Sequence, residues 1–170
     1  MKTTSISILA LVLVLCLSDI GRADLVDISV ATDKPTYQVG EEVKVYVRAY
    51  NPGLDSVTLT FGSNIQTSYW MDDIYDWQAG RDRLWVLTYA TINPNTTHTW
   101  ELIHGSYEMS VYPLEIGTHS VVGIVGAYEL SGNGESSPIE FEVIPEPASL
   151  IILTTGSLWI FRYSRSLVKH

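Results

Sequence analysis

Apolar and polar residues alternate along several short stretches of the chain. In residues 43–50, valines and an alanine occupy every second position, and tyrosines and basic residues stand between them. Residues 57–61, 97–102 and 139–143 alternate in the same way. Successive side chains of a β-strand point to opposite faces, so this period is typical of strands with one buried face. The pattern predicts strands over these four stretches.

Two further strands are expected from their apolar content. Residues 119–125 form a nearly continuous β-branched run around Gly123, which is typical of a central strand, and Ile28 and Val30 indicate a first strand. No long stretch has the period of a helix. Turn-forming residues separate the runs, at Asp33-Lys34-Pro35, Gln38-Val39-Gly40, Asn51-Pro52-Gly53, Asn93-Pro94-Asn95 and Ser131-Gly132-Asn133-Gly134.

Short strands with regular breaks predict an all-β domain over residues 24–144. The expected architecture is an immunoglobulin-like antiparallel β-sandwich of about seven to nine strands. Hydrophobic residues make up 46% of the chain and charged residues 17%, which is enough apolar material for a packed core.

The first 23 residues have the order of parts of a secretory signal peptide. Lys2 precedes an apolar stretch over residues 6–17, and the small residues Gly21 and Ala23 follow it. This order predicts export, with cleavage between Ala23 and Asp24.

Two other interpretations of this N-terminus fit less well. An uncleaved anchor helix needs roughly 20 apolar residues. A lipoprotein signal acylated at Cys16 needs a small residue before the cysteine, where this chain has Leu15. Cys16 is the only cysteine, so the exported protein is expected to have no disulfide.

The C-terminal 26 residues also combine an apolar run with charged residues. Pro145 and Pro147 interrupt any strand, residues 148–161 are mostly apolar, and scattered basic residues follow. As a helix this run reaches about 21 Å, against about 30 Å of bilayer hydrocarbon. The segment predicts a short transmembrane helix with its basic end in the cytoplasm, and the alternative is a last core strand or helix.

Pro145-Glu146-Pro147, followed by the apolar run and the basic end, resembles the PEP-CTERM sorting domain of bacterial exported proteins. The resemblance covers residues 145–170. It implies processing by an exosortase, a membrane-embedded transpeptidase-like enzyme, in bacteria that make exopolysaccharide matrices. The sparse basic end and the polar residues in the apolar run differ from the family pattern.

The central region shows a second resemblance, over most of residues 25–144. The stretches DKPTYQVGEEVKVYVRAYNPGLDSVTLTF, INPNTTHTW and YPLEIG are similar to the BsuPI-type intracellular proteinase inhibitor domain, a small all-β module. This resemblance implies a proteinase inhibitor but assigns no inhibitory residue. In a rigid sandwich, the loop from Asn51 to Ser56 or that from Gly132 to Ser137 would enter the protease cleft.

The predicted domain is strongly acidic. Residues 24–144 contain five Lys and Arg against 17 Asp and Glu, a net charge of −12. Phosphate binding requires a basic patch, so the composition argues against nucleic acid as a partner.

The sequence predicts no catalytic residue, no metal ligand and no cofactor. His98, His104 and His119 do not stand at zinc-ligand spacing with carboxylates, so we expect them to be hydrogen-bonded residues of strands or loops. The acidic cluster at residues 72–76 lacks the EF-hand pattern and is interpreted as a solvated loop, with calcium binding as the alternative.

Aromatic residues are concentrated between Tyr69 and Tyr89. Their rings could stack on sugars, which makes Trp70, Trp77 and Trp85 candidate ligand-binding residues. The competing interpretation, which we favour, is that these tryptophans fill the core, with one of them at the surface.

Together these features predict a non-enzymatic exported protein of the cell envelope or extracellular matrix, with transient or lasting membrane anchoring. The expected partners are an exosortase, the membrane, and either an exopolysaccharide or a protease.

Overall fold

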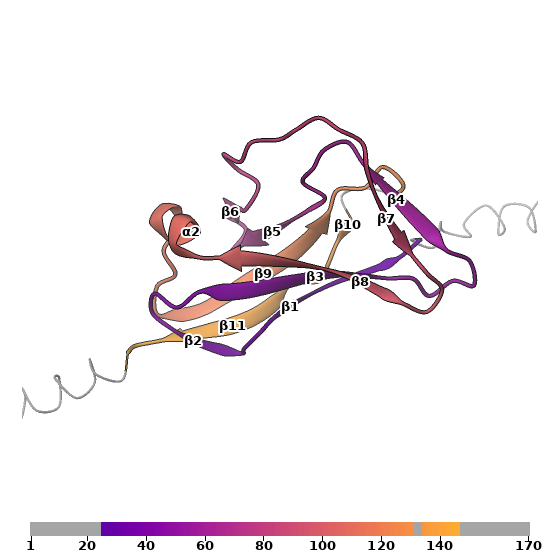
Figure 1. Ribbon diagram of the computed structural model, residues 1–170. Coiled ribbons are helices and arrows are strands. Elements are labelled where there is room, and N and C mark those ends of the chain that lie inside the picture. Colours follow the sequence, from indigo (N-terminus) through magenta and orange to yellow (C-terminus); the bar gives the residue numbers. More distant parts are fainter. Residues whose placement is uncertain (1–24, 131–133, 147–170) are drawn as a thin grey trace, which may run out of the picture.

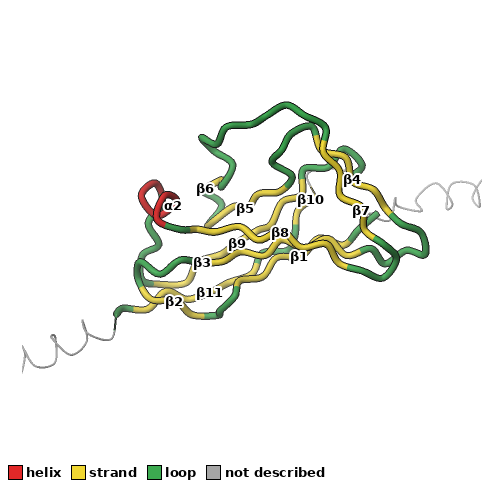
Figure 2. The backbone as a smooth tube through the Cα atoms, in the orientation of Figure 1, coloured by secondary structure: helices red, strands yellow, loops and turns green. Residues whose placement is uncertain are grey.

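The computed structural model describes residues 25–130 and 134–146, and Figures 1 and 2 show that this part of the chain consists mainly of β-strands. The predicted signal peptide, with its cleavage point between Ala23 and Asp24, and the predicted transmembrane segment, residues 148–161, lie outside these residues. The elements are β1 (Asp27–Thr32), β2 (Thr36–Gln38), β3 (Val43–Tyr50), β4 (Val57–Phe61), β5 (Thr67–Met71), β6 (Tyr75–Asp76), β7 (Thr88–Ile92), β8 (Thr97–His104), α2 (Ser106–Val111), β9 (Gly117–Val125), β10 (Gly134–Glu135) and β11 (Ile139–Ile144).

The strands form two main sheets and a separate ribbon. One sheet has the order β1-β3-β8, and the other has the order β2-β11-β9-β5-β6, with β10 beside β9. Strands β4 and β7 pair with each other as a two-stranded ribbon at one end of the molecule (Figure 1).

The alternation that predicted the strands is confirmed by burial. In β3, the four inward residues Val43, Val45, Val47 and Ala49 are fully buried, and the residues between them reach the surface. Strands β4, β8 and β11 bury every second residue in the same way over part of their length. Strand β9 is a central strand, between β11 and β5, as its β-branched run predicted.

The two main sheets pack face to face, and a glycine sets how closely they approach. A Cβ atom on Gly123 of β9 would lie 3.0 Å from Val47 and 3.1 Å from Val30, which belong to the opposite sheet. The absence of a side chain at this position lets the sheets meet over a core that includes Leu59, Phe61, Tyr69, Met71, Ile92, Val121 and Phe141.

The strand count and one pairing differ from the predicted sandwich. The described residues contain eleven strands, more than the seven to nine expected, because β2, β6 and β10 have only two or three residues each. All pairings are antiparallel except that of β2 with β11, which is parallel. The chain crosses from one sheet to the other after β1, and β2 therefore runs alongside the last strand.

The sequence did not predict the short helix α2. Its six residues follow Gly105, whose N–H donates to Oε2 of Glu108 at 3.0 Å. This bond satisfies a backbone donor at the start of the helix. Within the described ranges, no helix is long and apolar enough to cross a membrane.

Candidate binding groove

A groove of about 480 Å³ opens where the edge of one sheet faces the edge of the other. Strand β8 provides one side, and β5 with the residue run before it provides the opposite side. The segment after β6 provides the remaining lining residues. The lining residues are Asn64, Ile65, Gln66, Thr67, Trp77, Arg81, Asp82, Trp100 and Leu102.

Trp100 points inward from β8 into this groove. Its Nε1–H donates to Oε1 of Gln66 at 2.9 Å, and its ring meets Phe61 edge-on, with 6.2 Å between ring centroids. The Gln66 amide is oriented from its other end as well, because Nε2 donates to Oγ1 of Thr88 at 3.1 Å. The indole is therefore held in place while part of it lines the groove.

Trp77 enters the groove from the segment that follows β6. Its Nε1–H donates to the carbonyl of Ile103 at 3.2 Å, and its backbone N–H donates to the carbonyl of Tyr69 at 3.0 Å. The guanidinium carbon of Arg81 lies 3.7 Å from the ring centroid, over one face of the indole. Like Trp100, this tryptophan has its polar atom bonded within the protein.

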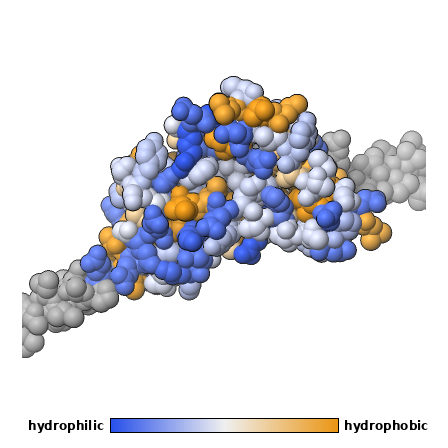
Figure 3. Space-filling view, viewed as in Figure 1, coloured by the Kyte–Doolittle hydropathy of each residue, from blue (hydrophilic) through white to orange (hydrophobic). Residues whose placement is uncertain are grey.

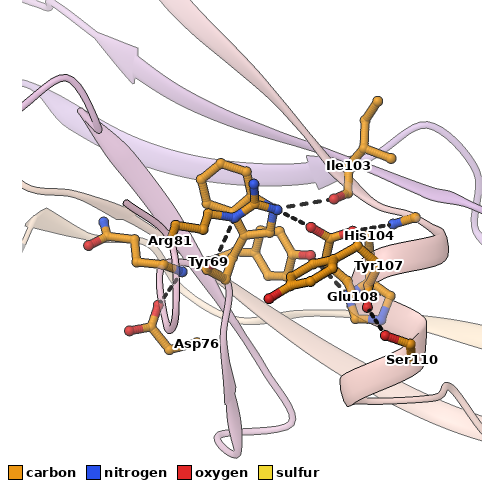
Figure 4. Close-up of polar contacts among 11 residues, drawn as sticks. Tyr69, Asp76, Arg81, Ile103, His104, Tyr107, Glu108 and Ser110 are labelled. Atoms are coloured by element: carbon orange, nitrogen blue, oxygen red, sulfur yellow. Dashed lines mark hydrogen bonds and ion pairs between the residues drawn. The ribbon is translucent and has the colours of Figure 1, made fainter. Parts of the chain in front are cut away.

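Arg81 is fixed by three contacts. Besides stacking on Trp77, its Nε donates to the carbonyl of Trp77 at 2.9 Å, and its Nη2 donates to Oε1 of Glu108 (Figure 4). Glu108 is only 5% exposed and also accepts the bond from Gly105. The pair joins the groove-lining segment to helix α2.

Two exposed polar groups at the groove retain hydrogen-bonding capacity. Asn64 accepts the N–H of Leu84 on its Oδ1 at 2.8 Å, and its Nδ2 has no partner among the residues that the structure describes. The carboxylate of Asp82 also makes no hydrogen bond within these residues. The groove thus offers a donor and an acceptor beside two indole rings.

Next to the groove runs an exposed segment that we call the apolar strap, residues 84–87. Leu84, Trp85, Val86 and Leu87 are all exposed, Trp85 to 82%. Figure 3 shows hydrophobic surface over the segment between β6 and β7. The strap is tied to the groove at Leu84, whose carbonyl accepts the N–H of Asn64 at 3.1 Å.

The three tryptophans predicted as ligand-binding residues lie in three different places. Trp77 lines the groove and packs against the core, and Trp85 lies on the apolar strap. Trp70 is half-buried in β5 and lines a separate hollow of about 260 Å³ with Asp73, Val122 and Glu135. Trp100 was not among the predicted ligand-binding residues, because it stands on a strand outside the aromatic cluster.

Behind the groove, buried hydrogen bonds join β5 to β8. The Tyr69 hydroxyl lies 2.9 Å from Nδ1 of His104, and Nε2 of His104 lies 3.0 Å from the carbonyl of Tyr112. A carbonyl only accepts, so Nε2 carries the proton and Nδ1 accepts from Tyr69. Burial lowers the pKa of His104 and raises that of Tyr69, so both side chains are neutral.

Asp72 forms a second cluster at the turn between β5 and β6. Its Oδ2 accepts from Nδ1 of His119 at 2.6 Å and from the Tyr112 hydroxyl at 2.9 Å, and its Oδ1 accepts from the Ser120 N–H at 2.7 Å. Partial burial would raise the pKa of Asp72, but these hydrogen bonds together hold it below its usual value. The prediction of a solvated acidic loop is wrong for Asp72, although Asp73 is exposed.

The three histidines make different contacts. His98 meets the ring of Trp100 edge-on at 4.4 Å between centroids, while His104 and His119 belong to the two clusters described above. Across residues 25–130 and 134–146, no group of three His, Cys, Asp or Glu side chains could hold a metal ion.

The loop from Asn51 to Ser56, considered for protease contact, is braced at its base. Nδ2 of the fully buried Asn51 donates to the carbonyls of Asp55 at 2.8 Å and Ile92 at 3.0 Å, and its Oδ1 accepts the Gly53 N–H at 2.9 Å. Leu54 in this loop is 89% exposed. The other loop considered, from Gly132 to Ser137, lies partly outside the described residues.

The predicted sorting motif begins directly after β11. Strand β11 ends at Ile144, Pro145 is half-buried and Glu146 is exposed, while Pro147 lies outside the described residues.

Comparison with known proteins gives only distant structural likenesses. No protein-family model and no curated protein matches the sequence. A CARDB domain from Pyrococcus furiosus, in complex with di-metal ions, is similar at 11% identity and a TM-score of 0.43, over 70% of this chain and 87% of that one. The sporulation control protein Spo0M of Bacillus subtilis gives 17% identity and a TM-score of 0.42, over 72% and 51%. A β-glucosidase from Listeria innocua gives 14% identity and a TM-score of 0.38, over 69% and 16%. TM-scores below 0.5 do not indicate a function for this chain.

Proposed function

We propose that the chain is a non-enzymatic exported protein that binds carbohydrate in the groove between β5 and β8. The observation that carries this proposal is the state of Trp77 and Trp100. Both indole N–H groups are bonded within the protein, so the rings are fixed, and both line an open groove.

The chemistry of a sugar ring fits these surfaces. A pyranose has an apolar face of C–H groups, which packs on an aromatic ring, and a rim of hydroxyls that both donate and accept hydrogen bonds. In the groove, Nδ2 of Asn64 can donate to a hydroxyl and the carboxylate of Asp82 can accept from one. The domain itself we take to be an immunoglobulin-like sandwich that holds these groups on fixed strands.

Binding to the polysaccharide of the producing organism tests this proposal. The purified full chain should be retarded in a native gel that contains the polysaccharide, and Trp77→Ala or Trp100→Ala should abolish the retardation. Trp70→Ala is the matched control, because Trp70 lies outside the groove. Circular dichroism checks that each variant is folded, and equal mobility of the wild type in gels with and without polysaccharide would overturn the proposal.

The two ends of the chain support a proposal about where in or outside the cell the protein acts. We propose that the signal peptide directs export and that an exosortase processes the PEP-CTERM tail, which delivers the domain to the cell envelope or the extracellular matrix. The position of Pro145 directly after β11 supports this proposal, since cleavage there would leave the strands intact.

Fractionation of cells tests the sorting step. Replacing Pro145, Glu146 and Pro147 by alanine should retain the protein in the inner-membrane fraction, whereas the wild type should reach the envelope or the medium. An unchanged distribution would contradict processing at this motif.

A second candidate function, protease inhibition, is favoured by one observation. Leu54 projects from a loop whose base is held by three hydrogen bonds of the Asn51 side chain. A rigid loop with an exposed apolar side chain loses little entropy when it enters a protease cleft. Micromolar protein should inhibit at least one protease of a panel, and Leu54→Asp should remove the inhibition. Full activity of every protease would exclude this function.

A further inference from the structure

The two charged side chains of the groove differ, because only one of them has its charge compensated within the protein. Among its lining residues, the charged side chains are Arg81 and Asp82. The guanidinium of Arg81 pairs with the buried carboxylate of Glu108, donates to the carbonyl of Trp77 at 2.9 Å and stacks on the Trp77 ring. A cation that is held this way has its charge compensated inside the protein. The carboxylate of Asp82 has no such compensation within the described residues.

The other basic side chains make no ion pair with Asp82 within the described residues. Lys34 pairs with Glu41, and Lys44 lies 3.4 Å from Glu101. Arg83 donates to the side chain of Gln78, and Arg48 lies over the ring of Tyr46. The net charge of residues 24–144 is −12, so the whole domain repels anions at distances within the Debye length of about 8 Å at physiological salt.

From this balance we infer that the groove is selective for uncharged sugar units and rejects units that carry a carboxylate or sulfate. The inference rests on the proposed carbohydrate binding. Asp82 acts as the specificity-determining residue: it accepts hydrogen bonds from the hydroxyls of a neutral sugar, whereas a uronate at the same place meets a like charge. Repulsive elements of this kind are a general source of selectivity between related ligands.

The experiment uses the full chain and the polysaccharide of the producing organism, separated into neutral and acidic fractions on an anion exchanger. The neutral fraction should bind at least about tenfold more tightly than the acidic fraction at about 0.15 M salt. Chemical reduction of the uronate carboxylates to hydroxyls provides a matched ligand, and it should raise the affinity of the acidic fraction toward that of the neutral fraction.

The variant Asp82→Asn distinguishes a local effect from the charge of the whole domain. It should bind the acidic fraction several-fold more tightly than the wild type, so that the ratio between the affinities for the neutral and acidic fractions falls. Glu140→Gln, on the exposed face of β11, removes the same charge away from the groove and should leave both affinities unchanged. Asp82 is exposed and makes no hydrogen bond within the described residues, so we expect its variant to fold normally.

The outcomes separate this inference from the proposed function. If the acidic fraction binds as tightly as the neutral fraction, or if Glu140→Gln acts as strongly as Asp82→Asn, selectivity by the groove is wrong while carbohydrate binding stands. If neither fraction binds, the proposed function fails and the inference fails with it.

Discussion

The edge where β5 faces β8 is closed at one end and open at the other. At the closed end, Tyr69 and His104 are buried and hydrogen-bonded, and the ring of Tyr75 lies edge-on to His104 at 5.4 Å between centroids. At the open end, Gln66 and Trp100 make a similar bond across the same edge, but the indole lines the groove.

The difference shows how one kind of contact can serve two purposes. A buried bond between sheets satisfies polar groups that would otherwise be costly, so it contributes to stability. The same bond at a solvent-facing edge leaves the broad surface of the ring available to a ligand. We therefore expect substitutions at the closed end to reduce stability and those at the open end to reduce binding.

The largest expected effect is at His104. His104→Ala leaves the Tyr69 hydroxyl and the Tyr112 carbonyl without partners and creates a cavity in the core, so the free energy of unfolding should fall by about 3 kcal/mol. Urea denaturation of the full chain, followed by tryptophan fluorescence, measures this change. Tyr69→Phe removes only one hydroxyl and should cost about 1 kcal/mol. If His104→Ala lowers the free energy of unfolding by less than about 1 kcal/mol, the closed end is not needed for stability.

A smaller effect is expected at Asp72, and it depends on pH. The pKa of Asp72 in the folded protein lies below its usual 3.8, so its hydrogen bonds contribute fully to stability above pH 3.8, and the contribution is lost as the pH falls through the folded pKa. Asp72→Asn should be less stable than the wild type near neutral pH, and this difference should shrink below pH 3.8. Urea denaturation over a pH series gives both curves, and a difference that stays constant would contradict the assignment.

The smallest expected effect on stability is at the apolar strap. Trp85 is 82% exposed, so Trp85→Ala should change the free energy of unfolding by no more than about 0.5 kcal/mol. The same denaturation assay measures it, with Trp77→Ala as the partly buried counterpart. If the free energy of unfolding falls by more than about 1 kcal/mol, Trp85 contributes to packing. This result would weaken the contrast between a closed end that stabilises the fold and an open end that binds a ligand.

The predictability of the strands depended on which of their faces are buried. Strand β3 was predicted because one face is buried and the other is solvated. Strand β5 was not, since both its faces are covered: Ser68 is buried and donates to Asp76 at 2.9 Å, while Tyr69 points into the core. Strand β7 was not predicted either. Its exposed residue Tyr89 has a larger side chain than the buried Ala90 beside it, so the alternation of large apolar and polar residues that indicates a half-buried strand is missing.

The groove could be predicted only in part. The aromatic cluster correctly drew attention to Trp77, but nothing in the sequence connects it with Trp100 or with Gln66. These residues come together because β8 pairs with β3 and β5 pairs with β9, and such long-range pairings cannot be deduced from local alternation. The sequence allowed one of the three tryptophans at the surface but did not indicate that it is Trp85, because a tryptophan is equally suited to a core and to a surface contact.

The parallel pairing of β2 with β11 has a mechanical consequence. The last strand is bonded on both sides, to β9 over five residue pairs and to β2 over three, and the described chain begins and ends at opposite ends of the molecule (Figure 1). Consider a force that pulls the chain beyond Ile144 along the axis of β11 while the groove holds a polymer. This force loads the hydrogen bonds of β11 in shear, so that they must rupture together. An attachment through the C-terminal tail would therefore transmit tension into a strand that is hydrogen-bonded on both sides within its sheet.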